Sequence, residues 1–121
     1  MNLKNKRILL TGATGGVGRL LAKSLAAKGA VMMLVGRNTN KLITLKADIE
    51  RAGGKAMIIE ADLSKLDAPQ SVADSAQQQL GGIDILINNA GILDFIAFED
   101  QSAARISEVI QTNVTSLIQL T

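Results

Sequence analysis

The sequence of 121 residues contains no His, Cys, Tyr or Trp. Without Cys it can form no disulfide, no thiolate nucleophile and no Cys-based zinc site. Without His it lacks an imidazole base and the commonest transition-metal ligand. No phenol is present to pass a proton. Asp, Glu and Lys are therefore the acids and bases available for chemistry.

Proline, aromatic residues and long apolar runs are also scarce. There is one Pro, and no apolar run approaches the roughly 18 residues that a membrane span needs. The apolar stretch after the basic start is too short for a signal peptide. We therefore expect no membrane association and a cytoplasmic location, with which the lack of Cys is compatible. A content of 47% hydrophobic and 20% charged residues predicts one globular domain.

Charge is distributed unevenly along the chain. Residues 1–47 hold nine basic and no acidic side chains, and residues 48–121 hold four basic and eleven acidic ones, so +9 and −7 sum to the net charge of +2. A positive first half favours an anionic partner, either a phosphate-bearing small molecule or nucleic acid, although solubilising surface charge explains it equally well. Only Phe95 and Phe98 could stack on bases, so we expect no nucleic-acid partner.

Four short apolar runs alternate with helical patterns. The runs do not alternate with polar residues, which is typical of strands buried on both faces of a parallel sheet. They span residues 7–11, 31–35, 56–59 and 83–87. Apolar residues at helical spacing follow each run. These stripes are Val17, Leu20, Leu21 and Leu25; Leu42, Leu45, Ile49 and Ala52; Val72, Ala76 and Leu80; and a last helix over about 102–120.

Helix-end signals support this division. Asn38 or Thr39 is available as an N-cap of the second helix, and Gly29, Gly53 and Gly81 stand where the first three helices should end. Strand–helix repeats with right-handed crossovers predict an α/β fold, a Rossmann-like doubly wound parallel sheet with strand order 3-2-1-4. No linker divides the chain, so residues 1–121 are interpreted as part of a single domain.

A glycine-rich loop joins the first strand to the first helix. Such a junction presents free backbone N–H groups and the positive end of the helix dipole, and residues without side chains let a pyrophosphate approach the backbone. A tight strand–helix turn is the alternative. The loop predicts a cofactor-binding segment made of Gly12, Thr14, Gly15, Gly16, Val17 and Gly18.

The spacing T-G-x-x-x-G-x-G, through Gly12, Gly16 and Gly18, resembles the short-chain dehydrogenase/reductase family. The same loop also fits G-x-x-G-x-x-G, the pattern of an extended branch that contains nucleotide-sugar epimerases. The segment Asn88-Asn89-Ala90-Gly91 resembles a signature of the compact, non-extended branch and favours that branch. The resemblance implies that this segment steadies the sheet and that Asn89, Ala90 and Gly91 line the cofactor.

The residue after the second strand bears on the choice of cofactor. In a dinucleotide fold an acidic residue there binds the ribose 2′-hydroxyl of NAD, and an Arg accommodates the 2′-phosphate of NADP. Here Arg37 and Asn38 occupy the position, and no acidic residue precedes Asp48. We therefore expect NADP, with NAD the weaker ligand and with Lys41 as a minor contributor. A solvated Arg at a helix start is the alternative.

Asp62 and Leu63 follow the third strand. In the family that the chain resembles, an Asp here bonds the adenine amino group and the next residue's backbone assists. An ordinary polar residue at a strand end is the alternative. The segment 93–98 could line a hydrophobic pocket or form a loop, and its residues leave both interpretations open.

The last helix carries Asn113 on its apolar face, where an unpaired amide would cost at least about 1 kcal/mol. An amide that ties two elements together is one explanation. The resemblance instead assigns Asn113 to the catalytic machinery, as the Asn whose backbone holds a water of the proton relay. The Ser and the Tyr-x-x-x-Lys pair of the family have no counterparts here, since there is no Tyr and the last Lys is Lys65.

Two interpretations of function follow. In the first, the chain is the N-terminal, dinucleotide-binding part of an NADP-dependent oxidoreductase that acts on a carbonyl or alcohol substrate as a homo-oligomer, and it is inactive by itself. In the second, it is a nucleotide-binding or interaction module without catalysis. If the sheet stops at the fourth strand, that strand is an unprotected edge. We therefore expect the isolated chain to self-associate or to be only marginally stable.

Overall fold

The computed structural model describes residues 2–63, 65, 67–89, 93–97, 102–104 and 106–107. Strands and helices alternate from the N-terminus, as the sequence predicts. In chain order they are β1 (Arg7–Thr11), α1 (Gly16–Ala27), β2 (Val31–Gly36), α2 (Thr39–Arg51), β3 (Lys55–Glu60), α3 (Ala68–Leu80), β4 (Ile85–Asn89) and β5 (Leu93–Ala97). Residues 103–104 and 106–107 are helical, at the start of the predicted last helix.

One five-stranded sheet forms the centre of the molecule, in the order β3-β2-β1-β4-β5. The pairs β3–β2, β2–β1 and β1–β4 are all parallel, which confirms the predicted order 3-2-1-4 and the Rossmann-like class. α1 connects β1 to β2 and α2 connects β2 to β3, and the chain crosses from β3 to β4 through α3, as parallel strands require.

β5 differs from the prediction. Leu93–Ala97 pairs antiparallel with β4, with Ile87 opposite Phe95, so the sheet does not stop at the fourth strand and β4 is not the bare edge expected in that case. The physical reason is the short connection: only residues 90–92 separate the two strands in sequence, so the chain can return along β4 and satisfy its outer backbone groups. The pattern used to predict the other strands, an apolar run without alternation, is typical of buried parallel strands and does not identify an antiparallel strand such as β5.

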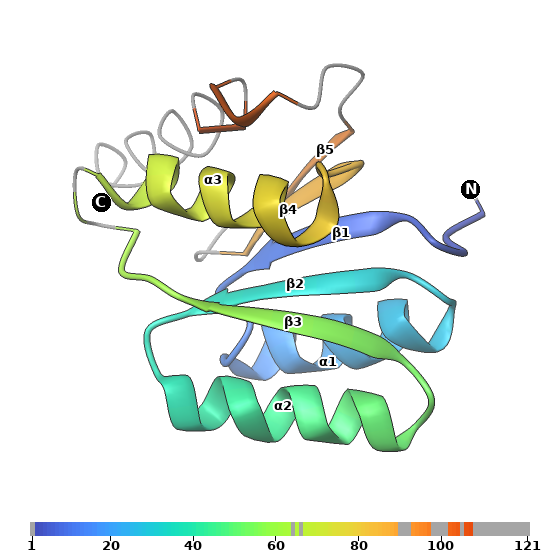
Figure 1. Cartoon of the computed structure of the whole chain (residues 1–121). Coiled ribbons are helices and arrows are strands. Elements are labelled where there is room, and N and C mark those ends of the chain that lie inside the picture. The colour runs from blue at the N-terminus through green and yellow to red at the C-terminus, as the bar shows by residue number, and fades with distance from the viewer. Residues whose placement is uncertain are drawn as a thin grey trace.

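Helices cover both faces of the sheet. α1 and α2 lie on one face and α3 on the other, as Figure 1 shows. Neighbouring residues of β1 point to opposite sides: Leu10 packs with α1 and α2, and Leu9 packs with α3. Strands buried on both faces explain why the apolar runs in the sequence do not alternate.

α1 buries a face that differs in part from the predicted one. Val17 and Leu20 are 61% and 69% exposed, whereas Gly18, Ala22 and Ala26 are buried. Small residues at this i, i+4, i+8 spacing let the helix lie close to the sheet. Leu21 and Leu25 of the predicted stripe are half-buried and pack against the core, so the stripe identified the helix correctly and was wrong about Val17 and Leu20.

The predicted helix ends are confirmed. The side chain of Asn38, the N-cap of α2, accepts a hydrogen bond of 3.1 Å from the backbone N–H of Lys41. Gly29, Gly53 and Gly81 have φ values of 91°, 89° and 75°, the left-handed conformation that glycine adopts without strain after a helix.

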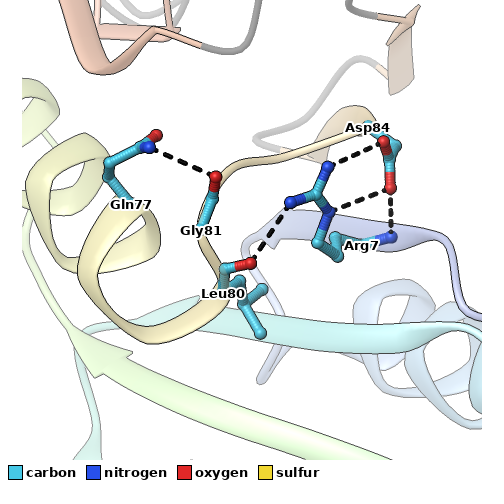
Figure 2. A network of polar contacts seen from close by, with 5 residues as sticks. All are labelled: Arg7, Gln77, Leu80, Gly81 and Asp84. Carbon is cyan, nitrogen blue, oxygen red and sulfur yellow. Dashed lines mark hydrogen bonds and ion pairs between the residues drawn. The ribbon is translucent and has the colours of Figure 1, made fainter.

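At the amino edge of the sheet, Arg7 at the start of β1 meets Asp84 just before β4 (Figure 2). The Arg7 backbone N–H donates to Asp84 Oδ2 over 2.8 Å, and its guanidinium donates to both carboxylate oxygens and to the Leu80 carbonyl. The hydrogen bonds from Arg7 hold the pKa of the Asp84 carboxyl below its usual range, against a smaller effect of burial. This pair lies at the edge opposite the glycine loop and joins the starts of β1 and β4.

Candidate functional site

The carboxyl ends of the parallel strands meet at one edge of the sheet. Thr11, the last residue of β1, is in register with Asn88 of β4, and Gly36 of β2 is in register with Glu60 of β3. In open α/β sheets ligands bind outside this edge. The loops that follow Thr11, Gly36 and Glu60 contain most of the residues that the sequence predicts for the cofactor.

A buried hydroxyl connects β1 to β4 at this edge. Thr11 Oγ1 donates to Asn88 Oδ1 over 2.8 Å and accepts from the backbone N–H of Asn89 over 3.0 Å. Thr11 and Asn88 are both buried. No role was predicted for Thr11 from the sequence. The one feature that pointed to this contact was a polar residue, Thr11 or Asn88, at the end of each of two strands predicted to be neighbours.

Two glycines of the loop are required by packing. A Cβ on Gly18 would lie 2.1 Å from the Gly12 carbonyl oxygen, and a Cβ on Gly12, whose φ is 62°, would lie 2.7 Å from the Asn89 carbonyl oxygen. The Asn89 side-chain amide also donates to the Gly12 carbonyl over 3.5 Å. Gly12, Gly18 and Asn89 are therefore in contact, and the loop is held against the end of β4.

The other two glycines are not required by packing. A Cβ on Gly16 would meet nothing within 4 Å, and one on Gly15 would make only an ordinary contact of 3.6 Å. α1 begins at Gly16 with Gly15 as its N-cap, no side chain caps it, and its first turn has no acidic residue. No side chain of Gly15 or Gly16 covers the backbone at this helix start. Such a helix start suits an anionic group.

The end of β2 lies beside the same loop. The backbone N–H of Ala13 donates to the Val35 carbonyl over 3.1 Å, and the Thr14 side chain packs against Gly36. Arg37 follows Gly36 and is exposed. In the next residues, Thr39 Oγ1 is buried and has no hydrogen-bond partner within the described part of the chain.

The segment after β3 is tied to β2. The backbone N–H of Ala61 donates to the Gly36 carbonyl over 2.9 Å, which brings Asp62 and Leu63 to the level of Arg37. Asp62 and Leu63 are both half-buried. The segment after β3 thus lies at the same edge of the sheet as the end of β2. Ala90, Gly91 and Asn113 lie outside the described residues.

A hollow between α1 and α2 was not predicted. It has a volume of about 280 Å³ and opens beside the glycine loop. Its walls are Thr14, Arg19, Asn40, Lys41, Thr44, Leu45 and Asp48. Sequence spacing could not place Arg19 of α1 opposite Lys41 of α2, since their approach depends on how the two helices pack.

Two features are absent from the described part of the chain. There, no cluster of three or more acidic side chains could hold a metal ion, the sequence having no His or Cys to contribute. No helix within these residues is long and apolar enough to cross a membrane.

Comparison with known proteins supports the geometry. A family model described as short chain dehydrogenase matches residues 6–121. The chain belongs to the short-chain dehydrogenase family. The chain is 37% identical over 119 residues to nodulation protein G of Rhizobium sp. (strain N33), covering 98% of this chain and 47% of that protein. Membership confirms the resemblance stated from the glycine loop and the Asn-Asn-Ala-Gly segment.

Two solved structures show the same fold. A metagenomic short-chain oxidoreductase in complex with NADP has a TM-score of 0.71 and 35% identity, over 76% of this chain and 42% of that chain. NAD⁺-bound xylitol dehydrogenase has a TM-score of 0.71 and 32% identity, over 76% of this chain and 35% of that chain. The chain thus spans less than half the length of each of these three proteins.

Proposed function

We propose that residues 1–121 form the N-terminal, dinucleotide-binding part of a single Rossmann-fold domain in an NADP-dependent oxidoreductase. The reaction is hydride transfer between the nicotinamide of the cofactor and a carbonyl or alcohol substrate. Family membership supports the reaction class, and the NADP complex of one structural neighbour supports the cofactor class.

The observation that carries the proposal is the difference between the two pairs of glycines. Packing within the chain explains Gly12 and Gly18, but it does not explain Gly15 and Gly16, where a Cβ would reach open space. A ligand that closely approaches the backbone at the start of α1 explains why both Gly15 and Gly16 lack a side chain. A pyrophosphate fits this place because it is anionic and accepts hydrogen bonds from N–H groups at a helix start.

Preference for NADP is proposed from Arg37. No acidic side chain follows β2 to bind a 2′-hydroxyl, and a guanidinium stands in its place. A charge-assisted hydrogen bond to a 2′-phosphate is worth about 1.5–3 kcal/mol, or about tenfold to a hundredfold in affinity. Asn38 already uses its side-chain oxygen to cap α2, so its amide nitrogen remains as a donor.

The remaining site residues have roles that the family resemblance implies. Asp62 and the backbone of Leu63 hold the adenine, Asn89, Ala90 and Gly91 line the cofactor, and the backbone of Asn113 holds a water of the proton relay. The bound dinucleotide supplies or accepts the hydride. We propose that these 121 residues bind the cofactor without turnover, because the family's Tyr has no counterpart in them.

Calorimetric titration of the chain with NADP and NAD tests the proposal. We expect NADP to bind more tightly, and Arg37→Ala to weaken NADP by about tenfold or more while changing NAD little. Lys28→Ala is the matched control, since Lys28 is the C-cap of α1, at the end of that helix away from the glycine loop. Equal losses for both cofactors in Arg37→Ala would remove the assignment of Arg37, and no binding of either cofactor would overturn the proposal.

The alternative of a non-catalytic binding module shares the cofactor site and differs in chemistry. Oxidation of NADPH by the protein with a set of ketones and aldehydes separates the two. Turnover supports the oxidoreductase, and cofactor binding without turnover by the complete protein supports the module. The homo-oligomeric state and the cytoplasmic location remain predictions.

A further inference from the structure

The hollow between α1 and α2 has an unbalanced charge. Arg19 and Lys41 both line it, both are exposed, and neither forms an ion pair with any residue that the structure describes. Two cations that face one hollow repel each other unless an anion lies between them. An acidic partner would therefore be expected on its wall.

The one carboxylate on that wall is already engaged. Asp48 Oδ2 lies 3.7 Å from Lys23 Nζ of α1, and Asp48 Oδ1 is hydrogen-bonded to Arg51. With Lys23 and Arg51 beside it, Asp48 does not neutralise Arg19 and Lys41. The hollow keeps a positive charge, and its polar walls add the hydroxyls of Thr14 and Thr44.

The hollow is continuous with the cofactor site through Thr14. This residue lies on the wall of the hollow and also packs its side chain against Gly36, the residue before Arg37. Arg37, Thr14 and the hollow are thus consecutive parts of one surface. Arg37 is therefore adjacent in sequence to a residue that Thr14 contacts, and Thr14 belongs to the wall of the hollow.

We propose that Arg19 and Lys41 form a second cationic wall for the 2′-phosphate end of NADP, so that selectivity over NAD is shared between Arg37 and the α1–α2 hollow. The inference rests on the proposed function and adds Arg19 as a specificity-determining residue. We assign the effect of Arg19 to the positive electrostatic potential of the hollow, and not to the pyrophosphate site at the start of α1. Its effect should therefore fall mainly on ligands with a 2′-phosphate.

Adenosine 2′,5′-bisphosphate and 5′-AMP are the appropriate probes, because they differ only in the 2′-phosphate. We expect Arg19→Gln and Lys41→Gln each to weaken the bisphosphate by about three- to fivefold, with 5′-AMP unchanged. Affinity of the original chain for the bisphosphate should fall more steeply with added NaCl than that of Arg19→Gln.

Lys28→Gln and Lys46→Gln are the matched controls. Lys28 is the C-cap of α1 at the opposite edge, and Lys46 pairs with Glu50 on α2 outside the hollow, so both remove one positive charge elsewhere. A loss in Arg19→Gln no larger than in these controls overturns the inference and leaves the proposed function intact. Failure of the original chain to prefer the bisphosphate over 5′-AMP overturns the NADP assignment as well.

Discussion

Arg7 and Asp84, 77 positions apart in the sequence, join the starts of β1 and β4 by reciprocal contacts. The backbone N–H of Arg7 donates to the Asp84 carboxylate, and the backbone N–H of Asp84 donates to the Arg7 carbonyl over 2.8 Å. The guanidinium also bonds the Leu80 carbonyl at the end of α3 (Figure 2). The pair thus connects two strands and a helix at the edge away from the glycine loop.

Asp84→Asn should destabilise the fold by about 2 kcal/mol at pH 7, because it removes a charge-assisted acceptor of hydrogen bonds. The pKa of Asp84 is lowered in the folded chain, so its stabilisation is complete above the ordinary value of about 3.9 and disappears as the pH falls through the folded value. In urea unfolding, the difference in free energy of unfolding between the original chain and Asp84→Asn should be smaller near pH 3 than at pH 7. Asp67→Asn, at an exposed position, should have little effect at either pH.

Gly16→Ala and Gly18→Ala should separate binding from folding. Alanine at position 18 places a Cβ 2.1 Å from a backbone oxygen, which we expect to cost about 2–4 kcal/mol of stability. Alanine at position 16 meets nothing, so stability should be unchanged or should rise by up to about 1 kcal/mol, while NADP affinity falls at least about tenfold. Thermal unfolding and calorimetry measure the two effects. Undiminished NADP affinity in Gly16→Ala would contradict a pyrophosphate at the helix start.

Thr11→Val should cost about 2–4 kcal/mol, since it leaves the Asn88 side-chain oxygen and the Asn89 N–H without their shared partner in a buried position. Thr11→Ser keeps the hydroxyl and should recover most of this stability. The glycine loop lies against Asn89, so the valine variant should also bind NADP more weakly. Urea unfolding and calorimetry of the two variants test this, and equal stability of Val and Ser would show that the hydroxyl contributes nothing.

The pairing of β4 with β5 predicts slow hydrogen exchange in both strands. Amides of Ile85–Asn89 that point away from β1 should be protected by β5, along with their partners in Leu93–Ala97. Exchange followed by NMR, with the mass of the chain in solution measured by sedimentation, checks this. Fast exchange in Leu93–Ala97 together with self-association would restore the bare-edge interpretation of β4.

Local chemistry explains why much of the fold could be predicted. Val31–Gly36 is apolar throughout because both of its faces are buried, and Gly29 and Gly53 mark helix ends because each requires a positive φ. The glycine loop was recognisable because its position between a strand and a helix gives its backbone one main use. These signals lie within a few neighbouring residues.

Long-range packing explains what could not be predicted. The inner face of α1 consists of Gly18, Ala22 and Ala26, and only the distance of that helix from the sheet makes small residues the buried ones. β5 depends on a choice between parallel and antiparallel pairing that its five residues do not encode. The hollow exists because α1 and α2 lie side by side on one face of the sheet.

The sequence by itself determined the alternation of strands and helices, the glycine-rich start of α1 and the Arg in place of an acid after β2. Each of these features depends on backbone conformation or side-chain chemistry within a few neighbouring residues. The tertiary structure alone decided which glycines serve packing and which leave room for a ligand, and which cations share a hollow. These properties are distances between segments far apart in the chain, and hydrophobic periodicity carries no information about them.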